Sequence, residues 1–261
     1  MFSFKQNINQ AIQNNAGSHS PYLVPTTGIV ANMRSVKDDG ERRNLERAIA
    51  ISDEALSLVS PNIKAGITER QVAWDIERTI RELGAESVAF DIIVAAGQNG
   101  ALPHHRPDDT LIQTGDSVVV DMGATYGGYR SDLSRTFCVG PPDNRFQEIY
   151  KTVLEAQVAA EESIRPQMTG ADVDSIAREK IALAGYGKYF GHGLGHGVGL
   201  EIHEWPRVVP RSNDILVDGM IFTIEPMINS GKYDIKMLND GWTAVTKDKS
   251  LSAQFEHTVG I

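Results

Sequence analysis

Acidic residues stand at the ends of apolar, strand-like segments of this chain, and two of them are close in sequence. Asp121 follows three consecutive valines, and Asp132 lies eleven residues later. An acid in such a run is costly to bury unless something neutralises it. If the chain turns at Tyr126-Gly127, Asp121 stands directly opposite Asp132, with Cβ atoms roughly 5 Å apart. Like charges placed in this way predict a shared proton or a metal ion, whereas a turn elsewhere would leave Asp132 in solvent.

Three further residues extend this pair to a set with metal-ligand chemistry. Glu225 ends the apolar segment IFTIE, Glu256 follows the segment AQF, and His196 lies in the glycine-rich segment GHGLGHGVG. Four carboxylates and one imidazole are suited to two adjacent divalent ions. A shell dominated by oxygen fits Mn, Co, Fe or Zn better than it fits a purely soft metal.

Other common chemistries find no support in the residues. Neither a GxGxxG segment after a strand nor a GxxxxGK[ST] segment occurs, so no nucleotide-binding fold and no organic cofactor is predicted. The single cysteine, Cys138, allows no intrachain disulfide and is typical of a reducing compartment. Its neighbours are apolar and strand-like, so we interpret it as a core residue and not as a nucleophile.

The elements that must position these residues follow from the spacing of apolar side chains. Helices are predicted over residues 38–59, 68–84, 145–164 and 171–184. Strands are predicted over residues 88–95, 117–124, 129–139, 200–204, 220–228 and 254–260. Residues 1–27 are rich in Asn, Gln and Ser, and they predict a loose arm or a short helix near residues 8–12.

The order of elements repeats within the chain. One helix pattern recurs at a constant offset of 101 residues: Thr68, Val72, Ile76, Ile80 and Gly84 correspond to Thr169, Val173, Ala177, Ile181 and Gly185. Chance amphipathicity could explain that match alone. However, Gly115 stands six residues before Asp121 and Gly219 six before Glu225, so that one acid superposes on the other. Two helices followed by strands, twice over, predict an internally duplicated α+β domain.

Composition and charge exclude several classes of protein. Hydrophobic residues make up 41% and charged residues 23%, which is ordinary for a globular chain and argues against disorder. The net charge of −9 disfavours general binding to nucleic acid or to an anionic membrane. No apolar run is long enough to cross a membrane, and the N-terminal residues lack a signal-peptide core. The sequence therefore predicts a cytoplasmic protein.

Three stretches together resemble a known family. They are ALPHHRPDDTLIQTGDSVVVDMGATYGGYRSDLSRTFCVG, HGLGHGVGLEIHEWP and IFTIEPMI. They are similar to the pita-bread metallopeptidases, which include methionine aminopeptidase, Xaa-Pro aminopeptidase and prolidase. The resemblance covers residues 35–261 and implies a pita-bread catalytic domain, with internally duplicated helix-helix-strand halves around a curved antiparallel sheet. Residues 1–34 are then an N-terminal arm or the remnant of a missing N-terminal domain.

The resemblance also implies roles for individual residues. The ligands of two divalent metal ions would be Asp121, Asp132, His196, Glu225 and Glu256. Asp121 and Glu256 would be bridging or bidentate, and Glu225 would also act as the general base. His104 resembles the substrate-contacting histidine of the family, in preference to His105. His203 resembles the histidine that donates a hydrogen bond to the scissile carbonyl.

The implied activity is that of a metalloaminopeptidase, with peptides as substrates. The middle of the chain, including LEIHEWP, looks more like Xaa-Pro enzymes, whereas the C-terminal segment looks more like methionine aminopeptidase. Gln254 stands where Xaa-Pro relatives usually carry Arg, and Trp242 matches a residue that lines the methionine pocket. Phe90 is a further candidate for the pocket wall, although each aromatic could simply belong to the core.

The residues alone leave two other functions possible. Some pita-bread relatives have lost their ligands and are non-catalytic peptide- or protein-binding modules. Others are metal-free hydrolases similar to creatinase. The presence of all five ligand types favours the enzyme over both. The sequence leaves the oligomeric state, monomer or homodimer, and the native metal open.

Overall fold

The computed structural model describes residues 24–101, 105–229, 235–237, 244–246 and 252–261. The chain divides into two compact units, Met1–Met33 and Arg34–Ile261. Helix α2 (Ile29–Ser35) is the first described element. The short helix that we predicted near residues 8–12 lies outside the described residues. All elements discussed below belong to the second unit.

The first half of this unit begins with a helical pair. Its elements are α3 (Asp39–Val59), η1 (Ser60–Asn62), α4 (Glu69–Glu82), β1 (Ser87–Val88), β2 (Ile93–Ala96), η2 (Gly97–Ala101), β3 (Ser117–Met122), β4 (Ala124–Tyr126), β5 (Tyr129–Arg130) and β6 (Leu133–Cys138). Asp38 caps α3 in a reciprocal capping box with Glu41. Thr68 caps α4 by accepting from the backbone N–H of Gln71. Both predicted helices are confirmed.

The long strands predicted in this half are shorter in the structure, because each is interrupted. Strands β2, β3 and β6 form an antiparallel sheet with β3 at its centre. Strands β1, β4 and β5 form a separate small sheet. Gly123 separates β3 from β4. A Cβ atom at Gly123 would overlap the backbone carbonyl of Ser131, so glycine allows the two segments to approach closely there.

The second half repeats the helical pair and adds a larger set of strands. Its elements are α5 (Asn144–Ser163), α6 (Gly170–Leu183), η3 (Gly187–Tyr189), β7 (Gly195–Gly197), β8 (Glu204–Val208), β9 (Ile221–Ile224), β10 (Met227–Asn229), β11 (Ile235–Met237), β12 (Ala244–Thr246), β13 (Ser252–Gln254) and β14 (His257–Gly260). The helices are again where the apolar spacing predicted them. The strand predicted over residues 200–204 begins only at Glu204, as β8. Residues 200–203 form a bend, in which the backbone N–H of Glu201 donates to the carboxylate of Glu204.

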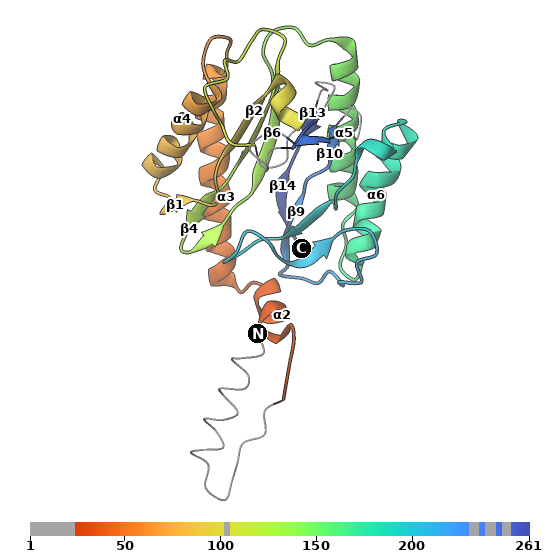
Figure 1. Cartoon of the computed structure of the whole chain (residues 1–261). Coiled ribbons are helices and arrows are strands. Elements are labelled where there is room, and N and C mark those ends of the chain that lie inside the picture. The colour runs from red at the N-terminus through yellow and green to blue at the C-terminus, as the bar shows by residue number, and fades with distance from the viewer. Residues whose placement is uncertain (1–23, 102–104, 230–234, 238–243, 247–251) are drawn as a thin grey trace, which may run out of the picture. The chain divides into compact units, whose positions relative to one another are not determined.

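The two halves have the same topology. In the first, β3 pairs with β2 and β6; in the second, β9 pairs with β7 and β14, antiparallel throughout. Figure 1 shows the pair α3 and α4 on one side of the strands and the pair α5 and α6 on the other. Each half has its own buried apolar cluster, one containing Ile76 and Val120, the other Ile181 and Phe222. The internal duplication predicted from the sequence is thus present in the architecture.

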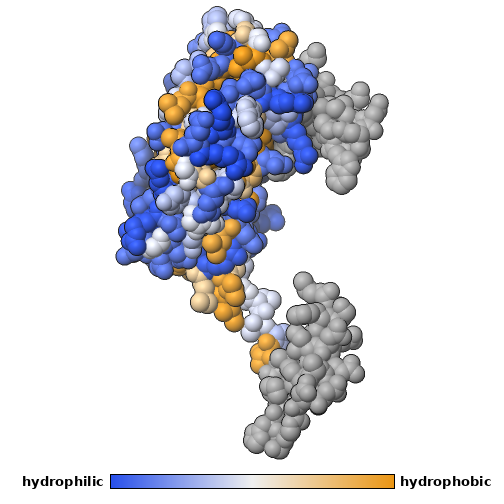
Figure 2. Space-filling view, turned by 90° about the vertical axis from the view of Figure 1, so that its left-hand side faces the viewer, coloured by the Kyte–Doolittle hydropathy of each residue, from blue (hydrophilic) through white to orange (hydrophobic). Residues whose placement is uncertain are grey.

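The outer faces of the helices are mainly polar. Figure 2 views the side that carries α3 and α4, where hydrophilic residues predominate and hydrophobic ones lie among them. Leu58 and Trp74 are the large exposed hydrophobic side chains on these two helices. None of the helices in the described part of the chain combines the length and the apolar character that a membrane-spanning helix needs.

Candidate metal centre and active site

Five side chains from four separate stretches of the sequence line one cavity of about 480 Å³. The first half provides Asp121 from β3 and Asp132 from the segment between β5 and β6. The second half provides His196 from β7, Glu225 from the end of β9, and Glu256 from between β13 and β14. The duplicated halves therefore converge on the residues that the sequence singled out as ligands.

The pairing of β3 with β6 differs from the prediction by two residues. Asp121 stands opposite Ser134 and not opposite Asp132. The reason is the turn: Gly127 and Gly128 both have positive φ and form a two-residue hairpin loop, which moves the centre of the hairpin by one residue. Since side chains alternate with a period of two, Asp132 still lies on the same face as Asp121. Both acids consequently reach the cavity although they are not cross-strand partners.

Glycines explain why a histidine can sit between two neighbouring strands. A Cβ atom at Gly195 would overlap the backbone carbonyl of Thr223, and one at Gly197 would overlap that of Trp205. The backbone N–H of His196 donates to Thr223 Oγ1 at 3.2 Å. The glycine-rich segment thus allows β7 to approach both β8 and β9, and it holds the imidazole at the cavity.

The imidazole of His196 presents a lone pair to the acids. Its Nδ1 donates to the backbone carbonyl of Gly197 at 3.1 Å, so Nε2 is the atom without a proton in the neutral ring. Nε2 lies 3.4 Å from Glu225 Oε1 and 3.7 Å from Asp132 Oδ2. Burial lowers the pKa of His196 to about 4, so these contacts are not ion pairs near neutral pH. A lone pair facing two carboxylates calls for a cation between them.

Two of the four carboxyl groups, Asp132 and Glu256, are buried, and the other two are half-buried. Among the described residues, no lysine or arginine side chain forms an ion pair with any of the four. Burial raises the pKa of Asp121 to about 7 and, together with the charge of Asp121, that of Glu225 to about 8. Burial and the neighbouring carboxylates raise the pKa of Asp132 and of Glu256 well above the ordinary values. Without a cation the site is therefore expected to hold protons.

Two carboxylate oxygens provide a direct test of whether a metal fits. Within the described residues, Asp121 Oδ1 and Glu256 Oε1 are buried and have no hydrogen-bond partner. The other oxygen of Glu256 accepts from Ser134 Oγ at 2.8 Å, which orients the carboxylate. One ligand atom from each of Asp132, His196 and Glu256 lies within 4.8 Å of the others. These oxygens and the nitrogen lone pair fit divalent cations.

The structure describes some of the predicted substrate-contacting residues and not others. The ring of His203 packs on that of His196 with centroids 4.3 Å apart, and it lines the cavity together with Phe90. His104 and Trp242 lie outside the described residues. His105 lines the cavity, and its Nε2 lies 2.7 Å from Glu69 Oε2.

Several polar side chains that support the site were not assigned from the sequence. Ser134 orients Glu256, and Gln254 Nε2 lies 3.4 Å from Glu225 Oε2 and donates to it. Glu69 is fully buried in the first turn of α4 and also accepts from the backbone N–H of Ala96 at 2.7 Å. Ser134 had a sequence signal, because it stands two residues after Asp132 and so shares its face. Glu69 had no sequence signal other than its position next to the helix cap Thr68.

Comparison with known proteins agrees with this geometry. The model of metallopeptidase family M24 matches residues 43–261. An Xaa-Pro dipeptidase from Pyrococcus horikoshii is 48% identical over 200 residues, which cover 77% of this chain and 57% of that protein. The chain spans less than two thirds of the length of such curated relatives.

Solved structures show the same architecture. Prolidase from Pyrococcus furiosus superposes with a TM-score of 0.80 at 42% identity, covering 89% of this chain and 64% of that one. Methionine aminopeptidase from Thermotoga maritima has a TM-score of 0.77 at 29% identity, covering 87% of this chain and 94% of that one. These likenesses confirm the pita-bread fold. The chain belongs to metallopeptidase family M24, whose cofactor is a pair of divalent metal ions.

Proposed function

We propose that this chain is a dinuclear-metal-dependent exopeptidase that hydrolyses the N-terminal bond of peptides. Residues 35–261 would be its catalytic domain, and residues 1–34 an N-terminal arm or the remnant of a further domain. The observation that carries the proposal is the convergence of four carboxyl groups, buried or half-buried, and one neutral imidazole on a single cavity. The relatives named as Xaa-Pro dipeptidase and prolidase support the same activity.

Five side chains would hold the metal ions: Asp121, Asp132, His196, Glu225 and Glu256. A pair of bound divalent ions makes water more acidic and polarises a carbonyl group. We propose Glu225 as the general base; in support, its Oε1 lies 3.4 Å from His196 Nε2 and its Oε2 accepts from Gln254 Nε2 at 3.4 Å. We propose that Glu225 accepts the proton of the attacking water and passes it to the leaving amine.

The histidines next to the ligands would bind the reacting peptide group. His203 lies against His196 at the cavity, where a ring N–H can donate to the scissile carbonyl oxygen as negative charge develops there. We assign the same general role, contact with the substrate, to His104 on its position in the sequence motif. The acidic surroundings favour an ammonium group, so the free N-terminus of the peptide is the natural anchor for an exopeptidase.

For the substrate, we propose Xaa-Pro peptides first and peptides with N-terminal methionine second. The Xaa-Pro dipeptidase relative is 48% identical, against 29% for the methionine aminopeptidase structure. Phe90 lines the cavity and is a candidate wall of the side-chain pocket. Trp242 is a second candidate from its position in the sequence alone. We propose a cytoplasmic location and Mn, Co, Fe or Zn as the metal, and we expect neither nucleic acid nor a membrane as a partner.

The test is a comparison of two peptide classes on protein loaded separately with Mn and with Co. We expect release of the first residue from Ala-Pro-Pro-type peptides, with slower cleavage of Met-Ala-Ser. Chelation and Asp132→Asn should both abolish hydrolysis, whereas the matched change Asp109→Asn, at an exposed ion pair with Arg70, should not. About two metal ions per chain with no cleavage of either peptide would instead favour a non-catalytic peptide-binding module.

A further inference from the structure

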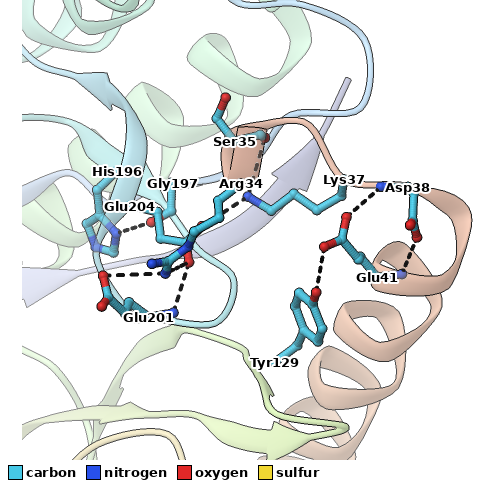
Figure 3. A network of polar contacts seen from close by, with 10 residues as sticks. All are labelled: Arg34, Ser35, Lys37, Asp38, Glu41, Tyr129, His196, Gly197, Glu201 and Glu204. Atoms are coloured by element: carbon cyan, nitrogen blue, oxygen red, sulfur yellow. Dashed lines mark hydrogen bonds and ion pairs between the residues drawn. The ribbon is translucent and has the colours of Figure 1, made fainter. Parts of the chain in front are cut away.

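A buried carboxylate next to the candidate active site is held by two cations from a distant segment. The side chain of Glu204 is only 4% exposed, and its Oε1 accepts a hydrogen bond from Arg34 Nη2. Its Oε2 lies 3.5 Å from Nζ of Lys37, whose side chain is 1% exposed. Figure 3 shows both cations pointing at this carboxylate, with Glu201 beside Arg34. The paired residues are 170 and 167 positions apart in the chain.

Glu204 also organises the loop that precedes it. The backbone N–H of Glu201 donates to Glu204 Oε1 at 2.9 Å, and that of Gly199 donates to the carbonyl of Glu201 at 3.1 Å. A Cβ atom at Gly199 would lie 2.7 Å from Glu204 Oε2, so the loop is wrapped closely around the carboxylate. The conformation of residues 199–203 therefore depends on where this carboxylate is held.

His203 is the last residue of this loop and is bonded directly to Glu204. Its ring packs against His196 with the two planes at 66°. The backbone of the loop and that ring contact both constrain the orientation of the His203 ring. A shift of the Glu204 carboxylate that alters the loop would move His203 relative to the cavity. Glu204 pairs with Gly197 of β7, but His196 has a separate anchor, the hydrogen bond from its backbone N–H to Thr223 Oγ1.

The segment that carries the two cations is anchored to the residues just before β9, the strand that leads to Glu225. Lys37 donates its backbone N–H to Gly219 at 2.8 Å, and Val36 forms an isolated antiparallel bridge with Met220. Met220 directly precedes β9, and Glu225 directly follows it. Residues 34–37 therefore connect the strand of Glu225 to the loop of His203 through the carboxylate of Glu204.

Burying these charges contributes little to the stability of the fold. Lys37 and Glu204 are almost fully removed from water, whereas the Arg34 side chain stays 28% exposed. The cost of desolvating such charges can exceed their attraction, and a packed apolar group often serves stability as well. Lys37 illustrates the cost, because burial lowers the pKa of its ammonium group even though Glu204 opposes the shift. What the charges provide and an apolar group cannot is a fixed direction for the carboxylate.

We propose that Arg34 and Lys37 are positioning residues that act through Glu204 to set the orientation of His203 relative to Glu225. The consequence of orientation rests on the proposed exopeptidase function, whereas the orientation itself does not. Misplacement of a reacting group by about 1 Å can lower a rate by about 100-fold. Loss of the cations or of the carboxylate is therefore expected to lower turnover without removing metal.

The experiment compares Glu204→Gln, Lys37→Met and the double variant with the wild-type protein. Glu46→Gln is the matched control, because it makes the same change in an exposed ion pair with Arg42. In metal-loaded protein, Glu204→Gln and Lys37→Met should lower kcat by about 10- to 100-fold, with KM and metal content within about twofold of wild type. The double variant should lose no more than Glu204→Gln alone, because Lys37 acts through Glu204.

A second readout needs no activity. The ring signals of His203, assigned by their loss in His203→Ala, are recorded by nuclear magnetic resonance in zinc-loaded protein. They should shift in Glu204→Gln and Lys37→Met and stay unchanged in Glu46→Gln. Unchanged ring signals in both variants, or losses of kcat that add up in the double variant, would overturn the proposal. If the wild-type protein cleaves no peptide, the proposed function fails, and the ring signals still decide the positioning role. If Glu204→Gln does not fold, Lys37→Met alone carries both readouts.

Discussion

Replacement of Asp121 by asparagine should stabilise the metal-free protein at alkaline pH while it prevents metal binding. In the folded protein burial raises the pKa of Asp121 to about 7, from an ordinary value of 3.8. Asparagine has nearly the same shape and carries no charge. The change therefore removes the cost of ionising a buried acid, and it also removes a ligand that the cofactor needs.

The size of the effect follows from proton linkage. Between pH 5 and pH 7 the aspartate is ionised in the unfolded chain and protonated in the folded one, so the folded state binds more protons and its stability falls as pH rises. The slope is about 1.36 kcal/mol per pH unit, which gives about 3 kcal/mol over this range. Above pH 7 the loss of folding stability levels off. Below about pH 4 the folded protein keeps the full stability that depends on the protonation of Asp121. Because the charge of Asp121 also raises the pKa of Glu225, the substitution should reduce the pH slope of Glu225 as well.

The assay is urea unfolding of chelator-treated protein at pH 5, 6, 7, 8 and 9. The free energy of unfolding of wild type should fall relative to Asp121→Asn by about 3 kcal/mol between pH 5 and pH 8. The exposed pair of Asp109 with Arg70 provides the control, and Asp109→Asn should follow the wild-type curve. Loading wild type with divalent metal should abolish the fall. Equal pH slopes in wild type and Asp121→Asn would refute the reasoning.

Three further outcomes test other parts of the argument. His203→Ala should lower kcat by about 100-fold or more with metal content unchanged, as metal analysis and steady-state kinetics would reveal; equal loss of both would assign His203 to the metal. Ile76→Ala, at a fully buried position, should lower the free energy of unfolding by about 2–5 kcal/mol in denaturant titrations, and a loss below 1 kcal/mol would contradict that packing. Gly195→Ala forces a Cβ atom onto the carbonyl of Thr223, so both stability and metal binding should fall in calorimetry; wild-type behaviour would mean that the close approach is not required.

Local features of the sequence were sufficient to predict most helices and the order of the fold. Apolar spacing located α3 and α4 to within a residue or two, and the structure shows Asp38 and Thr68 as their caps. The same spacing, repeated 101 residues later, predicted α6 and the duplication. Helix caps and helix faces involve residues only a few positions apart, so their signals are present in any short window of the chain.

The site was predictable in part for a related reason. An acid at the end of an apolar run is unusual wherever it occurs, and each of Asp121, Glu225 and Glu256 could be singled out before their separation in space was known. The strand register was not predictable in the same way. It depended on whether the turn centred on Tyr126-Gly127 or on the glycine pair that follows, a difference of one position.

The tertiary structure decided how segments far apart in the chain meet. The predicted strand over residues 200–204 begins only at Glu204, because a bend precedes it, and no local pattern indicated that the Glu204 carboxylate contacts Arg34 and Lys37. Ser134 and Glu256, separated by 122 positions, form a hydrogen bond that no local sequence pattern predicts. Such contacts arise when duplicated halves pack against each other, and their partners are chosen by the register and curvature of whole sheets. The sequence by itself determined the chemical character of the groups in the cavity; only the folded chain determined their distances, their protonation and the residues that hold them.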